Sequence, residues 1–171
     1  MKQLLDIFVP GKLGGAGSKV SFKHPKTGRI ITTAASKYEM PWKDSVRAAV
    51  KETIGERAVA RGPIVFEMTF VFVRPSSHLN TSGMLNKKGR SMPLPTAYWD
   101  TTKLVRSTED ALNKLLWYDD KQVVKQVNGK EWGPQMGARI IVREIEPLDE
   151  TSQLEGVQNN GEEERSTEAG Q

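Results

Sequence analysis

Apolar residues in the first 145 positions form short runs and alternating patterns that predict β-strands. Residues 4–9 are apolar apart from Asp6 and stop at a proline-glycine pair, which predicts a first strand. Residues 64–73 carry apolar side chains in both alternating sets, with Glu67 as the exception, which predicts a strand near the middle of a sheet. Residues 137–145 predict the final strand.

Two longer segments have apolar residues at helical spacing. Residues 40–54 begin with Met-Pro-Trp and carry an apolar stripe headed by Trp42, which predicts a helix packed on the core. Lys43 belongs to the opposite side of that helix and is expected to be exposed. A second helix is predicted after Asp100, with an apolar stripe that starts at Leu104.

Polar residues of the second helix give two local expectations. Thr101 or Thr102 is expected to cap its start, because hydroxyl oxygens accept hydrogen bonds from the first free backbone N–H groups. Arg106 and Asp110 are one turn apart, which predicts an ion pair on the helix surface.

Turn residues divide the remaining chain. Pro-Lys-Thr-Gly before Arg29 predicts a hairpin that joins residues 20–22 to 29–33. Asn128-Gly129 predicts a second hairpin turn, after a strand at 122–127. These elements predict an α+β fold: one domain with a mixed β-sheet packed with two main helices.

Two segments are predicted to be loops. Residues 11–19 contain four glycines near two lysines, without the spacing of a P-loop, and are read as a flexible loop. Residues 74–95 are rich in Ser, Gly, Asn and Pro and predict a long loop, in which His78 is expected to be solvated.

The composition narrows the chemistry. The 171 residues include no cysteine and two histidines, which excludes disulfides, zinc-thiolate sites and histidine-rich metal sites. Any metal must be held mainly by oxygen, which favours Mg²⁺, with Mn²⁺ as the alternative. The N-terminal apolar run is too short for a signal peptide, and no run is long enough for a membrane span, so a soluble, cytoplasmic protein is expected.

Charge is distributed unevenly along the chain. From Glu146 onward there are eight acids and one base, a net charge of −7, which leaves +11 for residues 1–145. An acidic tail on a basic body is common in nucleic-acid-binding proteins, although a solvated surface with a solubilising tail has the same composition. We expect a folded domain at residues 1–146 and a disordered acidic tail at 147–171.

Carboxylates bracket the second predicted helix. Asp100 precedes it, Asp119 and Asp120 follow it, and Arg106 lies between them. Carboxylates that hold a divalent cation, next to a guanidinium, suit phosphodiester hydrolysis. A plain polar turn at Asp119-Asp120 explains the spacing equally well.

The sequence Asp100-x-x-Lys-Leu-x-Arg106-x-x-x-Asp110-Ala-Leu, followed by Asp119-Asp120-x-Gln-Val-Val, resembles the RusA family of Holliday-junction resolvases, many of them encoded by bacteriophages. The resemblance implies a magnesium-dependent endonuclease that resolves four-way DNA junctions by paired nicks in recombination, repair or phage DNA processing. By this resemblance, Asp100, Asp120 and Arg106 are the catalytic residues. Asp100 and Asp120, with Asp119 beside it, would hold the metal.

One position departs from the family pattern. The second acid of the family's Asp-x-Asp pair falls on Thr102, a neutral and poor ligand for magnesium. Thr102 could act through a bound water, or Glu67 or Asp110 could help. The alternative function is a catalytically weakened protein that binds branched DNA on the same fold.

The family resemblance also implies a homodimer, whose two-fold symmetry matches that of a four-way junction. DNA phosphates are then expected to contact lysines of the basic body and its loops, namely Lys12, Lys19, Lys23, Lys87, Lys88 and Lys103.

Overall fold

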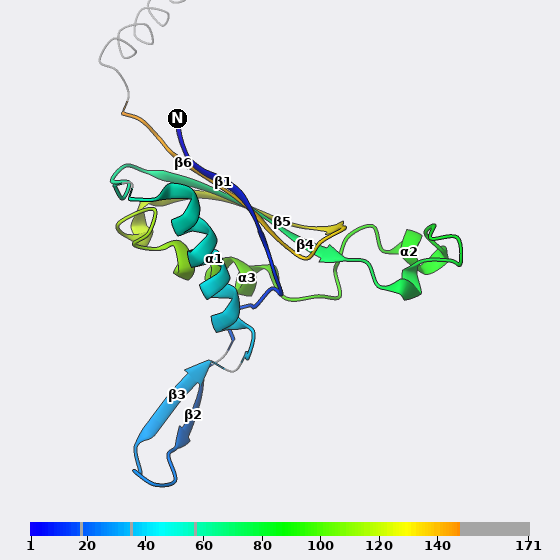
Figure 1. Cartoon of the computed structure of the whole chain (residues 1–171), viewed down its shortest axis with the longest axis horizontal. Coiled ribbons are helices and arrows are strands. Elements are labelled where there is room, and N and C mark those ends of the chain that lie inside the picture. The colour runs from blue at the N-terminus through cyan, green and yellow to red at the C-terminus, as the bar shows by residue number, and fades with distance from the viewer. Residues whose placement is uncertain (18, 35, 57, 148–171) are drawn as a thin grey trace, which may run out of the picture.

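A computed structural model shows a layered α+β domain (Figure 1). The structure describes residues 1–147 except 18, 35 and 57. The acidic tail expected at 147–171 therefore lies outside the described residues, apart from Pro147. Among the helices of the described residues, none is both long and apolar enough to cross a membrane.

The main sheet has four strands in the order β1-β6-β4-β5. β1 (Lys2–Pro10) and β6 (Gly137–Glu144) are antiparallel, as are β6 and β4 (Ile64–Val73). β4 runs parallel to β5 (Val123–Gly133), so the sheet is mixed, as predicted. β4 lies between two neighbours, and this explains why apolar residues occupy both of its faces.

Two helices cover one face of this sheet, α1 (Glu39–Ile54) and α3 (Thr101–Leu112) (Figure 1). Their predicted apolar stripes are buried in one core with alternate residues of the strands. Trp42 is 1% exposed, and its Nε1 donates a hydrogen bond to Thr108 Oγ1 across the helix pair at 3.0 Å. The prediction that Lys43 is exposed is wrong, because Lys43 is buried where α1 meets α3.

The hairpin turn predicted at Asn128-Gly129 is wrong. β5 continues through both residues, and they pair in register with Met68 and Thr69 of β4. The long parallel ladder with a central strand outweighs the local turn preference of an Asn-Gly pair. The chain instead turns at residues 134–136, which connect β5 to β6 on the other side of β4.

Residues 74–95 are folded into a lobe with its own short helices, η1 (Ser76–His78) and α2 (Lys87–Ser91). Arg74 Nη1 donates to the backbone oxygens of Gly89 and Met92 at 3.1 and 3.2 Å, and its guanidinium stacks on the Trp132 ring. The expectation that His78 is solvated is wrong: it is 4% exposed and packs edge-on against Trp132.

The predicted basic hairpin is confirmed as β2 (Lys19–Lys23) paired with β3 (Ile30–Ala34), a second, two-stranded sheet. Residues 11–17 before it are packed against the domain, although the glycines suggested a flexible loop. A Cβ on Gly14 would lie 2.0 Å from the Tyr38 carbonyl oxygen, so the glycine there permits a close backbone contact.

Candidate active site

The first acid of the motif, Asp100, lies at the amino end of α3. Its Oδ1 accepts a hydrogen bond from the Thr102 backbone N–H at 2.9 Å, so Asp100 caps the helix. The expected cap at Thr101 or Thr102 is therefore wrong; both residues lie in the first turn. An aspartate satisfies the same free N–H groups and also interacts favourably with the helix dipole.

Arg106 and Asp110 do not form the expected surface pair. Asp110 reaches Lys43 of α1 instead, with Oδ2 2.9 Å from Nζ. Lys43 Nζ also lies 2.9 Å from Glu39 Oε1, and Glu39 Oε2 accepts the Gly17 backbone N–H at 3.0 Å. Asp110 is thus part of an ion network that joins the two helices, while Arg106 remains on the exposed side of α3.

This network shifts the proton affinities of its two buried members. Burial favours the neutral form of Glu39, but hydrogen bonds from Lys43 and the Gly17 N–H outweigh it and lower the pKa of Glu39. Burial also favours neutral Lys43, yet its hydrogen bonds to Glu39 and Asp110 prevail and raise the pKa of Lys43. Both groups are therefore charged at neutral pH.

The second pair of acids follows α3 in a short turn, η2 (Asp120–Gln122). Asp119 caps η2, with its Oδ1 accepting the Lys121 N–H at 2.9 Å. Asp120 Oδ1 lies 3.4 Å from Nε1 of the fully buried Trp117, so the core fixes the direction of this otherwise exposed carboxylate.

Gln122 explains why glutamine belongs to this turn. Its Oε1 accepts the backbone N–H groups of Tyr118 and Asp119, both at 2.8 Å. Its Nε2 donates to the carbonyl oxygens of Ala60 and Gly62 at 3.0 and 2.9 Å. All four contacts are to backbone, so Gln122 holds the Asp119-Asp120 turn against the segment that enters β4.

Glu109 is a nearby acid that the sequence reasoning missed. It is half-buried on α3, and burial raises the pKa of its carboxyl; a hydrogen bond with Gln126 opposes the shift, and the Asp120 and Asp110 carboxylates add to it. The available signal was spacing, because Glu109 follows Thr102 by seven residues and so lies two turns further along the same side of α3.

The acids of the motif do not converge on one point. Glu109 follows Asp100 by nine positions along α3, a rise of about 14 Å, and Asp120 lies toward the Glu109 end. Across the described part of the chain, no three acidic or histidine side chains are grouped as a metal site. Glu67 is ion-paired with Arg143 on β6, as Asp110 is with Lys43.

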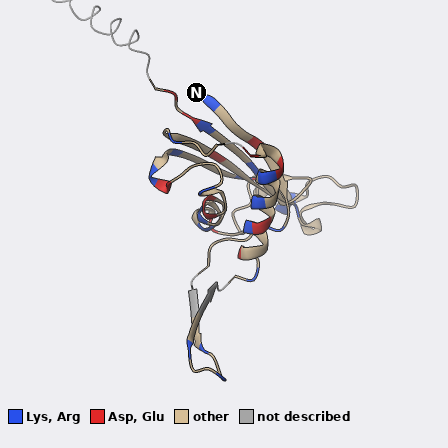
Figure 2. Ribbon diagram, turned by 60° about the vertical axis from the view of Figure 1, so that its left-hand side comes forward, with Lys and Arg blue, Asp and Glu red and all other residues tan. Residues whose placement is uncertain are grey.

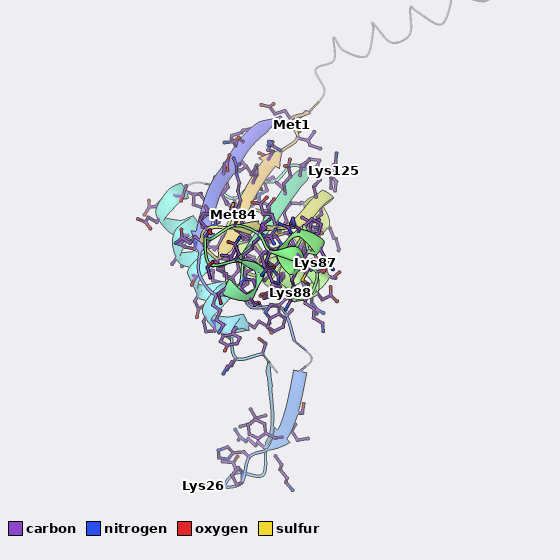
Figure 3. All side chains as sticks on the ribbon, turned by 90° about the vertical axis from the view of Figure 1, so that its right-hand side faces the viewer. Met1, Lys26, Met84, Lys87, Lys88 and Lys125 are labelled. Atoms are coloured by element: carbon purple, nitrogen blue, oxygen red, sulfur yellow. The ribbon has the colours of Figure 1, made fainter. Side chains whose placement is uncertain are left out.

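The expected DNA-contacting lysines lie on three separate parts of the surface. Lys103 is exposed near the start of α3, and Lys12 places its Nζ 4.1 Å from the centre of the Tyr38 ring. Lys87 and Lys88 are exposed on α2 in the lobe (Figure 3). Lys23 is exposed on the hairpin. Lys19 begins β2, but its side chain lies outside the described residues.

Comparison with known proteins identifies a family whose match covers this region of the chain. The family described as Endodeoxyribonuclease RusA matches residues 17–143, which include α1, α3, Asp100 and the Asp119-Asp120 turn. A Bacillus subtilis (strain 168) protein, described as uncharacterized protein YqaN, is 26% identical over 87 residues. That similarity covers 51% of this chain and 61% of the relative's length. By its match over most of the folded domain, this chain belongs to the family described as Endodeoxyribonuclease RusA.

Proposed function

We propose that this protein is a divalent-metal-dependent, structure-selective endonuclease that resolves four-way DNA junctions by paired nicks. The observation that carries the proposal is the RusA match together with the exposed positions of Asp100, Arg106 and Asp120 on and beside α3. The net charge of +11 on residues 1–145 favours a polyanionic substrate.

The divalent metal in this proposal comes from the family and not from a group of acids in the described residues. Carboxylate oxygens are the donors that Mg²⁺ prefers, and Asp100, Asp119 and Asp120 are exposed carboxylates. Their positions in the described chain do not form a three-acid group, so the arrangement does not fit a complete magnesium site.

The chain's own residues support three roles. Arg106 presents a permanent positive charge on the exposed side of α3, where it would stabilise the negative charge that builds up on the phosphate. Trp117 fixes the Asp120 carboxylate, and Gln122 fixes the backbone beneath it. In a two-fold homodimer, two such sites would face the two strands that a junction presents for nicking.

A nicking assay on a labelled four-way junction tests this function. With Mg²⁺ or Mn²⁺ the protein should make paired nicks, and with EDTA it should make none. Asp120→Asn should abolish nicking, and Arg106→Gln should slow it about 100-fold. Asp44→Asn is the matched control, because Asp44 is an exposed aspartate on α1. If linear duplex is cut as readily as the junction, junction resolution is wrong.

Thr102 favours one alternative, a protein that binds branched DNA and cleaves it poorly. Thr102 replaces an acid of the family pattern, and the two acids that could substitute for it, Asp110 and Glu67, are held in ion pairs. Junction binding without nicking in any divalent cation would support that alternative. An increase in nicking by Thr102→Asp would instead indicate an endonuclease whose site this threonine weakens.

We also propose that residues 1–146 form the nuclease domain and that residues 147–171 are not part of it. Support comes from the end of the described sheet, where β6 stops at Glu144 and the Ile145 backbone N–H donates to the Pro63 carbonyl oxygen at 2.8 Å. A chain ending at residue 146 should retain full nicking activity. A large loss of activity would place the tail within the functional unit.

A further inference from the structure

The β2–β3 hairpin stands away from the rest of the domain. We call residues 19–34 the arm. Its two strands pair only with each other, and the four strands of the main sheet make a separate ladder. In Figure 1 the arm projects from the end of the molecule where α1 begins, and Figure 3 shows Lys26 at its tip.

The arm exposes large apolar side chains that have no core to cover them. Phe22 is 47% exposed, Ile30 is 77% exposed and Ile31 is 38% exposed. Phe22 is paired with Ile31 and so shares one face with it, whereas Ile30 is paired with Lys23 on the opposite face. Apolar groups on both faces of a projecting two-stranded hairpin indicate a surface that binds a partner, because they do not pack in the core of the domain.

The charge of the segment identifies the kind of partner. Between Asp6 and Glu39 the chain has six lysines and arginines and no acid. Figure 2 shows the same pattern on the arm, with basic residues and no acidic ones. Two such arms would repel each other in a contact between copies of the chain, whereas DNA phosphates would attract both.

The segment that leads into the arm, residues 15–17, contacts α3, the helix that carries the motif. The Ala16 backbone N–H donates to the Lys103 carbonyl oxygen of α3 at 2.8 Å, and the Gly17 N–H donates to Glu39. A Cβ on Gly15 would lie 3.0 Å from the Trp99 ring, so this approach is also close. The segment that enters the arm is therefore held next to the amino end of α3, where Asp100 lies.

We propose that the arm recognises the branch point of DNA by inserting Phe22, Ile30 and Ile31 against bases that are unstacked there. Lys23, Lys26 and Arg29 hold the adjoining phosphates. Apolar side chains inserted between base steps are a known means of binding distorted DNA, and a branch point lowers the cost because its bases are already imperfectly stacked. The inference rests on the proposed function for its substrate, but not on cleavage.

Binding of the full-length protein to DNA in EDTA, where no nicking occurs, tests the arm separately from catalysis. The triple substitution Phe22→Ala, Ile30→Ala, Ile31→Ala should reduce the preference for a four-way junction over linear duplex at least tenfold, while linear-duplex affinity stays within twofold. The triple substitution Lys23→Gln, Lys26→Gln, Arg29→Gln should weaken both complexes and lower the salt slope of log K by about 2 to 3.

A base analogue gives a direct readout of unstacking. With 2-aminopurine at the branch point, the wild-type protein should raise the fluorescence and the apolar triple variant should not. Ile30→Ala alone should give an intermediate effect, because it leaves the Phe22–Ile31 pair intact. Phe8→Ala is the matched control, since Phe8 is 41% exposed on β1, and it should change neither quantity.

Three results would overturn the inference. The first is an apolar triple variant that keeps both the junction preference and the fluorescence change. The second is a triple variant that is monomeric where the wild type is dimeric, which would assign these side chains to a contact between copies. The third is wild-type protein without any preference for branched DNA, which would overturn the proposed function as well. If the protein prefers branched DNA but does not nick it, only the nuclease proposal is overturned.

Discussion

The ion network between α1 and α3 gives the sharpest stability prediction. Replacing Lys43 by methionine removes the charge but keeps most of the side-chain volume. It leaves Glu39, whose side chain is 10% exposed, without its cation. Asp110 loses the same partner, but its side chain is 45% exposed and water can replace the lysine.

The Lys43–Asp110 and Lys43–Glu39 pairs therefore contribute differently to the free energy of unfolding. A half-exposed pair such as Lys43–Asp110 contributes about 0 to 1 kcal/mol. Removing one partner of a buried pair costs about 3 to 5 kcal/mol, because the remaining charge is left in a poor solvent. Since the Gly17 N–H still donates to Glu39, we expect Lys43→Met to cost about 3 kcal/mol, near the lower end. For a domain of this size that lowers Tm by about 6 to 12 °C.

Urea unfolding at pH 7 measures the loss. Lys51→Met is the matched control, an exposed lysine on the same helix, and should change the free energy of unfolding by less than about 0.5 kcal/mol. Adding Glu39→Gln to Lys43→Met should recover most of the loss, because no buried charge then lacks a partner. If Lys43→Met and Lys51→Met are equally mild, or if Glu39→Gln adds a further loss, the reasoning is wrong.

The same network predicts how stability depends on pH. The pKa of Glu39 is lowered in the folded state, so its contribution is complete above the pKa of the unfolded chain and is lost as the pH falls through the folded value. In Lys43→Met, burial acts on Glu39 without the opposing lysine. The variant should therefore become relatively more stable as the pH falls and Glu39 is protonated, opposite to the wild type. An unchanged acid limb in the variant would contradict this account.

Three further predictions concern the core and the lobe. Thr108→Val leaves the Trp42 N–H without an acceptor and should cost about 1 to 3 kcal/mol in urea unfolding, whereas Thr53→Val, which removes only a bond to its own helix, should cost far less. Arg74→Met should leave global unfolding nearly unchanged but speed trypsin cleavage within the lobe, because two backbone contacts are lost; equal cleavage rates would refute this. Burial, helped by neighbouring cations, lowers the pKa of His78, so the contribution of His78 to stability is complete above its unfolded pKa and is lost as the pH falls through its folded pKa. His78→Leu should remove this contribution to the acid dependence of the free energy of unfolding. An acid dependence equal to that of the wild type would contradict the prediction.

The sequence by itself determined the elements whose signals are local or periodic. The helical stripes, the two-sided apolar pattern of β4 and the turn chemistry of the arm all depend on neighbours within a few residues, and each of these elements is present. The motif that resembles RusA also lies in one short segment, so its family could be recognised without any coordinates.

The tertiary structure decided the features that depend on distant partners. Asn128-Gly129 became strand because β4 pairs with it, Lys43 became buried because Asp110 lies across from it, and His78 became buried because Trp132 packs on it. Only the fold showed that Gln122 positions the acidic turn and that the buried Trp117 ring contacts Asp120. Pairing, burial and distance are set by which surfaces the fold brings together, and sequence spacing specifies them only within a single element.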